Sequence, residues 1–251
     1  MKVSLITVCL NSEKYIQTCI DSVLSQDYPH IEYIIIDGKS TDQTVDIVKS
    51  YGERINHFVS ESDKGLYDAM NKGIDLATGD IVGILNADDV YAHNQVISRM
   101  VSVFEQENSD VAFADLVYVK EENLDEVVRY FPGKGFHPGW FAKGLMPPHP
   151  TFFVRKKLYD QYGKFNTWYK ICADFDLMVR LFHTYQASYT YLPEVIVKMR
   201  VGGNSAWGKN TLTINREMLH SCKSHGIPTS LLRIYSKYLL KIFQLIKKPK
   251  T

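Results

Sequence analysis

Residues 81–89 read Ile-Val-Gly-Ile-Leu-Asn-Ala-Asp-Asp, an apolar run that ends in two adjacent carboxylates. A short apolar run that follows a turn such as Gly79-Asp80 is typical of a buried strand in a parallel sheet. Runs of the same kind lie at residues 2–9 and 31–36, and the second of these leads into Asp37. We therefore predict that these runs are strands of one sheet.

Helical patterns lie between the predicted strands. The helices are expected from Asn11-Ser12 to Pro29, after the turn at 38–42, and at about 66–77 and 94–106, with further strands at 55–60 and 111–114. This alternation predicts a mostly parallel sheet with helices on both faces. Ligands bind such sheets at the carboxyl ends of the strands, so Asp37 should lie close to Asp88-Asp89.

The second half of the chain has a less regular pattern. Its predicted elements are loops at 132–135 and 147–150, strands at 151–154, 189–192 and 195–200, and a helix at 175–184. No linker divides the chain into independent parts. We predict one α/β domain over residues 1–227, followed by an extension over residues 228–251.

Length and charge limit the class of protein. A chain of 251 residues suits one large domain. Its 29 Lys and Arg nearly balance its 28 Asp and Glu, so the basic excess of a nucleic-acid-binding protein is missing. The four scattered cysteines predict free thiols in a reducing compartment. Since no apolar run reaches about 18 residues, we predict a cytoplasmic location.

The adjacent carboxylates Asp88 and Asp89 are candidate metal ligands. Such oxygens suit Mg²⁺ or Mn²⁺, which can bridge a diphosphate and take up charge as it leaves. A solvated turn is the alternative for an isolated pair. The sequence contains neither a phosphate loop nor a G-x-G-x-x-G after the first strand, which disfavours an NTPase or a dinucleotide dehydrogenase. Asp37 is a candidate for a hydrogen bond to a nucleotide base or ribose.

Several blocks of sequence, taken in their order and spacing, resemble glycosyltransferase family 2. They are residues 3–11, 20–26, 34–42 and 65–73, then 86–89, which resembles the family's metal-binding D-x-D variant, and 173–180, which resembles its acidic block E-D-x-D-L. The match is closest to members that build bacterial cell-surface polysaccharides. It implies a GT-A type fold, with a Rossmann-like, mostly parallel sheet flanked by helices. Nucleotide-sugar binding is then expected in about residues 1–116, and the acceptor side in about 117–227.

The resemblance also implies roles for residues near the donor. Thr7 and Asn11 lie where the family's first loop contacts the base and ribose of the nucleotide. Asp37 matches the carboxylate that reads the base, which is most often uracil. Asp68 and Lys72 lie within one helical turn, so they either contact the donor sugar or diphosphate or form an exposed helix face.

The chemistry implied by the resemblance rests on three carboxylates. Asp88 matches the residue near the ribose and metal, Asp89 the principal ligand of Mn²⁺ or Mg²⁺, and Asp174 the general base. Asn86 and Ala173 depart from the acids that are more usual at their positions. One base without a protein nucleophile implies a single displacement that inverts the anomeric centre. The implied activity is metal-dependent transfer from a nucleotide-diphosphate sugar, with a UDP-sugar favoured, to a hydroxyl of a saccharide or lipid-linked acceptor.

The remaining candidates each have a structural alternative. His149 either lies near the acceptor or is a turn residue, and Asp176 either takes part in catalysis or pairs with Arg180. Trp140 and Trp207 either stack on a sugar or pack in the core. Arg200 with residues 202–204 forms either a late loop over the diphosphate or a surface turn.

Two other functions remain open at this point. A sugar nucleotidyltransferase would have a glycine-rich, basic first loop, whereas residues 8–12 read Val-Cys-Leu-Asn-Ser. A non-catalytic subunit that binds sugar nucleotides is allowed by Asn86 and Ala173.

The C-terminal extension is strongly basic. It contains no acid and six basic residues, namely Arg233, Lys237, Lys241, Lys247, Lys248 and Lys250. Removing them from the formal charge of +1 leaves −5 for residues 1–227. Arg233, Lys237 and Lys241 form a stripe on an otherwise apolar helix, which predicts peripheral binding to the anionic cytoplasmic face of the inner membrane. The alternative is docking on the enzyme itself or on a second copy in a homodimer.

Overall fold

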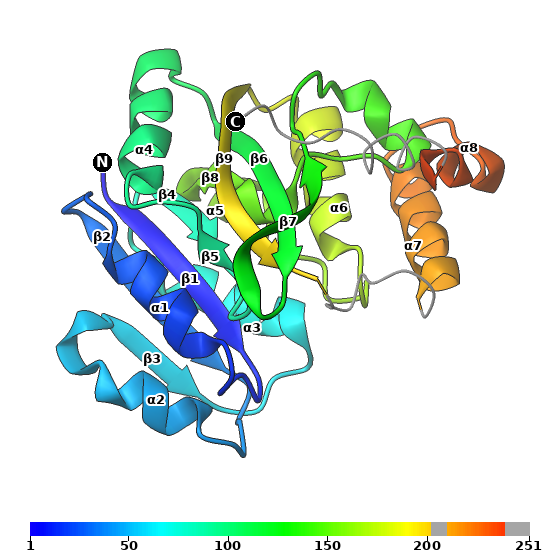
Figure 1. The fold of residues 1–251 in the computed structure, drawn as a ribbon. Helices are drawn as coiled ribbons and strands as arrows, with labels where there is room; N and C mark the ends of the chain where they lie inside the picture. The colour runs from blue at the N-terminus through cyan, green and yellow to red at the C-terminus, as the bar shows by residue number, and fades with distance from the viewer. Residues whose placement is uncertain (202–209, 239–251) are drawn as a thin grey trace.

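The computed structural model describes residues 1–201 and 210–238. Its N-terminal half contains four parallel strands in the order β3-β2-β1-β4 (Figure 1). They are β1 (Val3–Cys9), β2 (Ile31–Asp37), β3 (His57–Ser60) and β4 (Ile81–Ile84). The apolar runs of the sequence form these strands, as predicted: β1, β2 and β4 are buried on both faces, whereas β3 lies at the edge of the sheet and is partly exposed.

Helices cover both faces of this half of the sheet. They are α1 (Ile16–Leu24), α2 (Thr44–Ser50), α3 (Leu66–Leu76) and α4 (Val96–Glu107), with a 3-10 turn η1 (Gly52–Arg54). Ile6 of β1 belongs to the buried cluster that includes α3, whereas Leu5 belongs to the cluster that includes α1 and α4. The expected first helix begins later than Asn11, because the φ angle of Asn11 is 48° and lies in the left-handed region.

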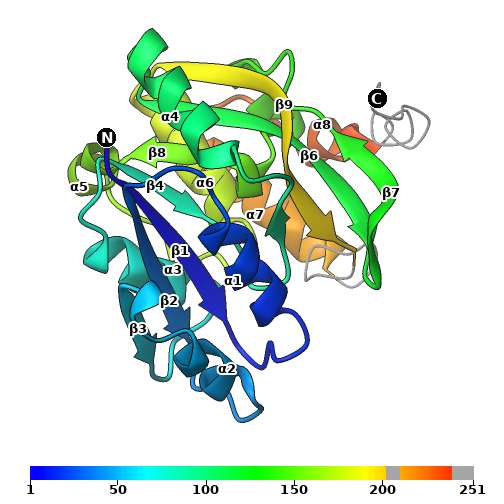
Figure 2. The ribbon, with the colours of Figure 1, turned by 60° about the vertical axis from the view of Figure 1, so that its left-hand side comes forward.

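The second half of the sheet is mixed rather than parallel. Its strands are β5 (Val90–Tyr91), β6 (Val111–Lys120), β7 (Asn123–Phe131), β8 (Phe153–Arg155) and β9 (Tyr189–Arg200). β8 lies antiparallel between β4 and β6, and β9 runs parallel to β6 (Figure 2). The strands predicted at 189–192 and 195–200 are one strand whose register shifts near Pro193, which has no N–H to donate.

Further helices lie beside the β6–β9 half of the sheet (Figure 1). They are the 3-10 turns η2 (Pro138–Lys143) and η3 (His149–Thr151), α5 (Lys156–Tyr162), α6 (Ala173–Val179), which continues into a π-helical turn at Arg180–Thr184, α7 (Thr211–Ser224) and α8 (Leu231–Tyr235). The helix predicted at 175–184 is confirmed. None of the described helices is long and apolar enough to cross a membrane.

The described start of the C-terminal extension docks on the enzyme. Ile234 is fully buried, and Lys237 is 1% exposed with its Nζ 2.9 Å from Sδ of Met218 in α7. The expected basic stripe is therefore wrong at Lys237, because this side chain lies against α7 and Arg233 remains exposed. Lys241 and the other lysines of the tail lie outside the described residues, as do Trp207 and residues 202–204.

Candidate active site

The carboxyl ends of β1, β2 and β3 meet at one edge of the sheet, where the loops that follow them pack together (Figure 2). Asn11 joins two of these loops, since its N–H donates to Ser40 Oγ at 2.8 Å and its Oδ1 accepts from the N–H of Thr41 at 2.9 Å. The side chain of Asn11 is exposed at this edge. These two hydrogen bonds connect the loop after β1 to the loop after β2.

The buried carboxylate of Asp37 connects the loop after β2 to the end of β3. Asp37 is fully buried, and its carboxylate accepts hydrogen bonds from Ser60 Oγ at 2.6 Å, from the N–H of Ser40 at 3.0 Å and from Ser40 Oγ. Burial and the nearby Asp37 raise the pKa of the Cys9 thiol, which donates to Asp37 from 3.6 Å. The oxygens of Asp37 are enclosed and already bonded, which disfavours the expectation that Asp37 reads a base.

Thr7 also lies beneath the site rather than in it. Its side chain is fully buried, and its hydroxyl lies 3.0 Å from the hydroxyl of Tyr33 and 3.8 Å from Cys19 Sγ. The side chain of Thr7 therefore packs in the core, and the expected place of this residue near the nucleotide stays a prediction. The residue alternation along β1 turns Thr7 toward the core on the α1 side.

Asp68 and Lys72 fasten the loop that follows β3. Lys72 Nζ donates to the carbonyl oxygen of Ser62 at 3.0 Å and pairs with Glu61 at 2.8 Å. Asp68 accepts from the N–H of Lys64 at 2.9 Å. The hydrogen bond that Lys72 donates to Glu61 and the charges of Asp68 and Asp63 raise the pKa of Lys72. The structure thus gives both residues a role in shaping the loop at the edge of the site.

Asp89 is a buried carboxylate with no hydrogen bond of standard geometry, although the backbone N–H of Arg200 and the side chain of Asn86 lie near enough to lower its pKa. It is fully buried directly after β4, and neither Oδ1 nor Oδ2 has a partner; the side-chain oxygen of Asn86 is also unpaired. Burial and the neighbouring Asp88 hold the pKa of Asp89 well above its usual range, although Arg200 opposes this. Burial also raises the pKa of Asp88, which is partly exposed.

These unpaired oxygens fit a hard cation. Buried polar atoms nearly always have a partner, so three unpaired oxygens at one strand end call for a ligand. Within residues 1–201 and 210–238, no three His, Cys, Asp or Glu side chains converge on one point. Asp89, Asp88 and the amide oxygen of Asn86 would therefore hold the cation together with oxygens of a bound diphosphate or water.

Arg200 holds the backbone of the Asp88-Asp89 pair. Its Nη1 donates to the backbone carbonyl of Asp88, its Nη2 donates to Thr18 Oγ1 at 3.0 Å, and its guanidinium lies 5.0 Å from the centre of the Tyr15 ring. Only 6% of Arg200 is exposed. The sequence predicted that Arg200 belongs to a loop over the diphosphate or to a surface turn. Neither describes Arg200 itself, because its side chain is enclosed between α1 and the loop after β4.

Asp174 lies in the first turn of α6, beside Tyr67 and His149. Its Oδ1 accepts from the N–H of Phe175 at 2.7 Å and lies 3.4 Å from the Tyr67 hydroxyl. Burial raises the pKa of Asp174, and the nearby His149 partly offsets this. Burial lowers the pKa of His149. Although Ala173 provides no carboxylate to raise the pKa of Asp174, burial has that effect, so the group suits a general base.

A residue that the sequence did not single out fixes the segment before Asp174. Glu217 of α7 accepts hydrogen bonds from the N–H groups of Lys170, Ile171 and Cys172 at 3.0, 3.0 and 2.9 Å. Glu217 is 8% exposed. The sequence held no local signal for it, because its partners lie more than 40 residues away.

Asp176 and Trp140 lie away from this group. Asp176 is buried against α7, where Ser221 Oγ donates to it at 2.9 Å and His225 Nε2 lies 3.3 Å away. Burial alone would raise the pKa of Asp176, but the hydrogen bonds from His225 and Ser221 bring it below its ordinary value. Trp140 is partly buried and contacts Phe136 edge-on at 5.9 Å. For both residues the structural alternative describes these contacts. Trp140 packs against the core, and Asp176 forms an ion pair, although its partner is His225 and not Arg180.

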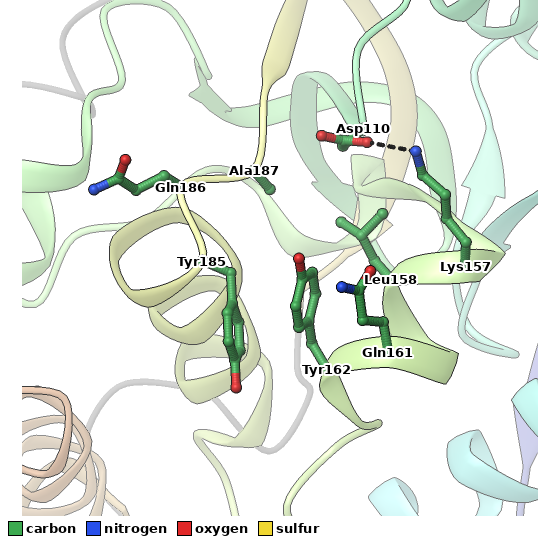
Figure 3. A pocket seen from close by; sticks show the side chains of 8 residues that line it. All are labelled: Asp110, Lys157, Leu158, Gln161, Tyr162, Tyr185, Gln186 and Ala187. Atoms are coloured by element: carbon green, nitrogen blue, oxygen red, sulfur yellow. Dashed lines mark ion pairs between the residues drawn. The ribbon is translucent and has the colours of Figure 1, made fainter.

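A separate hollow of about 200 Å³ lies at the opposite end of the sheet (Figure 3). Asp110, at the start of β6, pairs with Lys157 there at 3.1 Å, and the rings of Tyr162 and Tyr185 stack at 3.8 Å. None of the residues singled out by the sequence lines it. We therefore place the candidate active site at the carboxyl ends of the strands.

Comparison with known proteins identifies the family. The family model described as Glycosyl transferase family 2 matches residues 4–169. A Mycobacterium bovis protein named PGL/p-HBAD biosynthesis glycosyltransferase is 30% identical over 222 residues, which are 86% of this chain and 82% of that protein. The glycosyltransferase GlyG of Streptococcus pneumoniae is 22% identical, over 96% of this chain and 87% of that protein. The chain belongs to glycosyl transferase family 2 and is a glycosyltransferase.

Solved structures share the fold. S. aureus TarS 1-349, in complex with UDP-GlcNAc, has a TM-score of 0.68 and 20% identity over 88% of this chain and 66% of that chain. The mannosyltransferase PcManGT from Pyrobaculum calidifontis, in complex with GDP-Man and Mn²⁺, has a TM-score of 0.62 and 17% identity over 99% and 81%. The predicted GT-A type fold is thereby confirmed.

Proposed function

We propose that this glycosyltransferase uses Mn²⁺ or Mg²⁺ and inverts the anomeric centre as it moves a sugar from a nucleoside diphosphate. The donor is a UDP-sugar in preference to others, and the acceptor is a hydroxyl of a saccharide or lipid-linked molecule in cell-surface polysaccharide synthesis. The observation that carries this proposal is Asp89, a fully buried carboxylate at the end of β4 whose two oxygens make no hydrogen bond of standard geometry. A cation bound there would offset the charge of the departing diphosphate.

The chain's own residues divide the remaining work. Asp174 accepts the proton of the acceptor hydroxyl, and the acceptor oxygen attacks the anomeric carbon as the bond to the diphosphate breaks. A raised pKa makes Asp174 a stronger base than an exposed aspartate. Tyr67 and Glu217 hold it in place through bonds to Asp174 and to the segment before it. A single displacement of this kind inverts the anomeric centre.

The donor and metal have support from structures of the same fold. TarS was solved with UDP-GlcNAc, and PcManGT with GDP-Man and Mn²⁺. The relative from Mycobacterium bovis is named for PGL/p-HBAD biosynthesis, which supports assembly of a larger glycoconjugate. We infer the donor side in about residues 1–116 and the acceptor side in about 117–227.

We further propose that the C-terminal extension binds an anionic membrane surface. Leu232 is 84% exposed on α8, and Leu231 and Tyr235 are exposed beside it. Arg233 is exposed on the same short helix, and Lys241, Lys247, Lys248 and Lys250 follow in the sequence after the buried Lys237. Exposed apolar groups next to basic ones suit the headgroup region of an anionic bilayer.

The test of the donor and metal is thermal unfolding of the full chain with nucleotide sugars, with and without Mn²⁺. A ligand at 100 times its Kd stabilises the native state by about 2.7 kcal/mol. We expect one donor to raise the Tm, more so with Mn²⁺, and Asp89→Asn to remove the effect of Mn²⁺. The exposed Asp46→Asn is the matched control and should keep it. A chain whose Tm no nucleotide sugar changes would overturn the proposal.

A further inference from the structure

Three residues from successive loops meet beside Asn11, at the outer edge of the candidate donor site. They are Leu10 after β1, Gly38 after β2 and Asp63 after β3. A Cβ atom placed on Gly38 would lie 2.6 Å from Asp63 Oδ2 and 3.4 Å from Leu10 Cδ1. Only the missing side chain at position 38 leaves room for the carboxylate of Asp63, since a 2.6 Å contact lies well inside van der Waals distance.

The carboxylate of Asp63 is held in a fixed direction. Its Oδ1 accepts from the N–H of Gly65 at 2.8 Å, and Gly65 has a φ of 119° that favours glycine. The same loop is fastened by Lys72 to the carbonyl oxygen of Ser62 and by Asp68 to the N–H of Lys64. Among the hydrogen bonds of the described residues, Oδ2 of Asp63 takes part in none, so it remains an acceptor.

Leu10 supplies an apolar surface next to this acceptor. Its side chain is 57% exposed, although it follows a fully buried strand. An exposed leucine alone is ordinary. Here its Cδ1 atom and Asp63 Oδ2 both approach Gly38, so a flat ring could pack on Leu10 with its edge toward the carboxylate.

We infer that Asp63, and not Asp37, reads the nucleobase of the donor, and that it selects bases with a ring N–H. This inference rests on the proposed nucleotide-sugar donor. A carboxylate only accepts hydrogen bonds. It therefore suits N3–H of uracil or thymine and N1–H of guanine, and it repels the ring nitrogens of cytosine and adenine, which are acceptors at the same place. Such a mismatch between two acceptors disfavours the wrong base.

The experiment is calorimetric titration of the full chain with UDP, GDP, CDP and ADP in the presence of Mn²⁺. We expect the wild-type chain to bind UDP or GDP more tightly than CDP and ADP. In Asp63→Asn, the N–H of Gly65 keeps the amide oxygen, so the amide NH₂ faces the base. The affinity for the preferred diphosphate should then fall roughly ten- to hundredfold, since a hydrogen bond to a charged group contributes roughly that much. The ratio of CDP to UDP affinity should rise.

Two further variants separate this inference from a general loss of structure. Asp46→Asn is exposed on α2 and should leave all affinities unchanged. Gly38→Ala keeps an ordinary backbone conformation but displaces Asp63 Oδ2, so it should also weaken binding of the preferred diphosphate at an unchanged Tm. Failure of every diphosphate to bind the wild-type chain would overturn the proposed function. Equal binding of UDP by Asp63→Asn and wild type, or a wild-type preference for CDP, would overturn the role of Asp63 alone.

Discussion

Arg200 donates a hydrogen bond through Nη1 to the backbone carbonyl oxygen of Asp88, which joins the end of β9 to the loop after β4. The same guanidinium donates to Thr18 Oγ1 at 3.0 Å and faces the ring of Tyr15. One enclosed side chain therefore connects α1, β9 and the candidate metal ligands. Its positive charge also opposes the raised pKa of the neighbouring Asp89.

Replacing Arg200 with alanine should destabilise the chain. Thr18 and the Asp88 carbonyl would lose their donor, so we expect the free energy of unfolding to fall by about 1–3 kcal/mol in urea denaturation. The matched control is Arg99→Ala, because Arg99 is 51% exposed and its pair with Glu194 should contribute at most about 1 kcal/mol. Equal losses in the two variants would contradict a structural role for Arg200.

The pH dependence of transfer should report the pair Asp174 and His149. Asp174 acts as a base only when it is deprotonated, so kcat/KM should fall as the pH drops through its pKa. Burial raises that pKa, which moves the acid limb above the value of about 3.9 for an exposed aspartate. Because His149 holds the pKa of Asp174 down, His149→Gln should move the acid limb to higher pH.

The control for this pH profile is His57→Gln. His57 is 44% exposed and lies against Glu32 rather than Asp174. Its replacement should leave the acid limb in place. An acid limb that does not move in His149→Gln would show that the imidazole has no electrostatic influence on the base. Asp174→Asn should abolish transfer while the donor still binds.

Glu217→Gln should slow turnover more than it weakens donor binding. Glu217 now accepts hydrogen bonds from three backbone N–H groups. In glutamine, the amide NH₂ would face at least one of these N–H groups and could not accept from it, so the segment before Asp174 would shift. We expect kcat to fall about tenfold or more, with little change in the Kd of the donor. Glu107→Gln, on the exposed end of α4, is the control. A parallel loss of donor affinity would indicate a general structural role instead.

Two truncations should have different effects on the C-terminal extension. Removal of residues 239–251 leaves the buried Ile234 and Lys237 in place, so sedimentation with anionic liposomes should decrease with a smaller fall in Tm than in the longer truncation. Removal of residues 228–251 also takes away the buried Ile234 and Lys237, so the Tm should fall by several degrees. Unchanged sedimentation after the shorter truncation would refute membrane binding by the tail.

The sequence predicted the elements whose pattern is local. The strands β1, β2 and β4 and the helix α3 follow from unbroken apolar runs or from one apolar helical face. β7 was missed because most of its residues are exposed on a hairpin, and its sequence has no buried alternation. α7 was missed because polar residues such as Asn215 and Glu217 are buried in it.

The site was predictable in position but only partly in role. The ends of the strands located Asp88-Asp89 and Asp37 at one edge of the sheet, because parallel strands share a direction. Whether a carboxylate at that edge faces a ligand depends on its distant partners. Ser60 encloses Asp37, whereas Asp89 has no partner, and neither fact follows from the residues adjacent in sequence.

The position of Asp174 has a consequence for the engineering of this enzyme. The segment that matches the family ends at residue 169, before Asp174, which we propose as the base, and before Glu217, which fixes the segment that leads to Asp174. A hybrid enzyme joined at that limit would combine one parent's donor half with the other parent's base. Tyr67 lies in the donor half, and its hydroxyl donates hydrogen bonds to the carbonyl oxygen of Ile171 and to Asp174. In the hybrid, these two partners would come from the other parent. Exchange of acceptor specificity by recombination should therefore keep Tyr67 and residues 170–217 from the same parent.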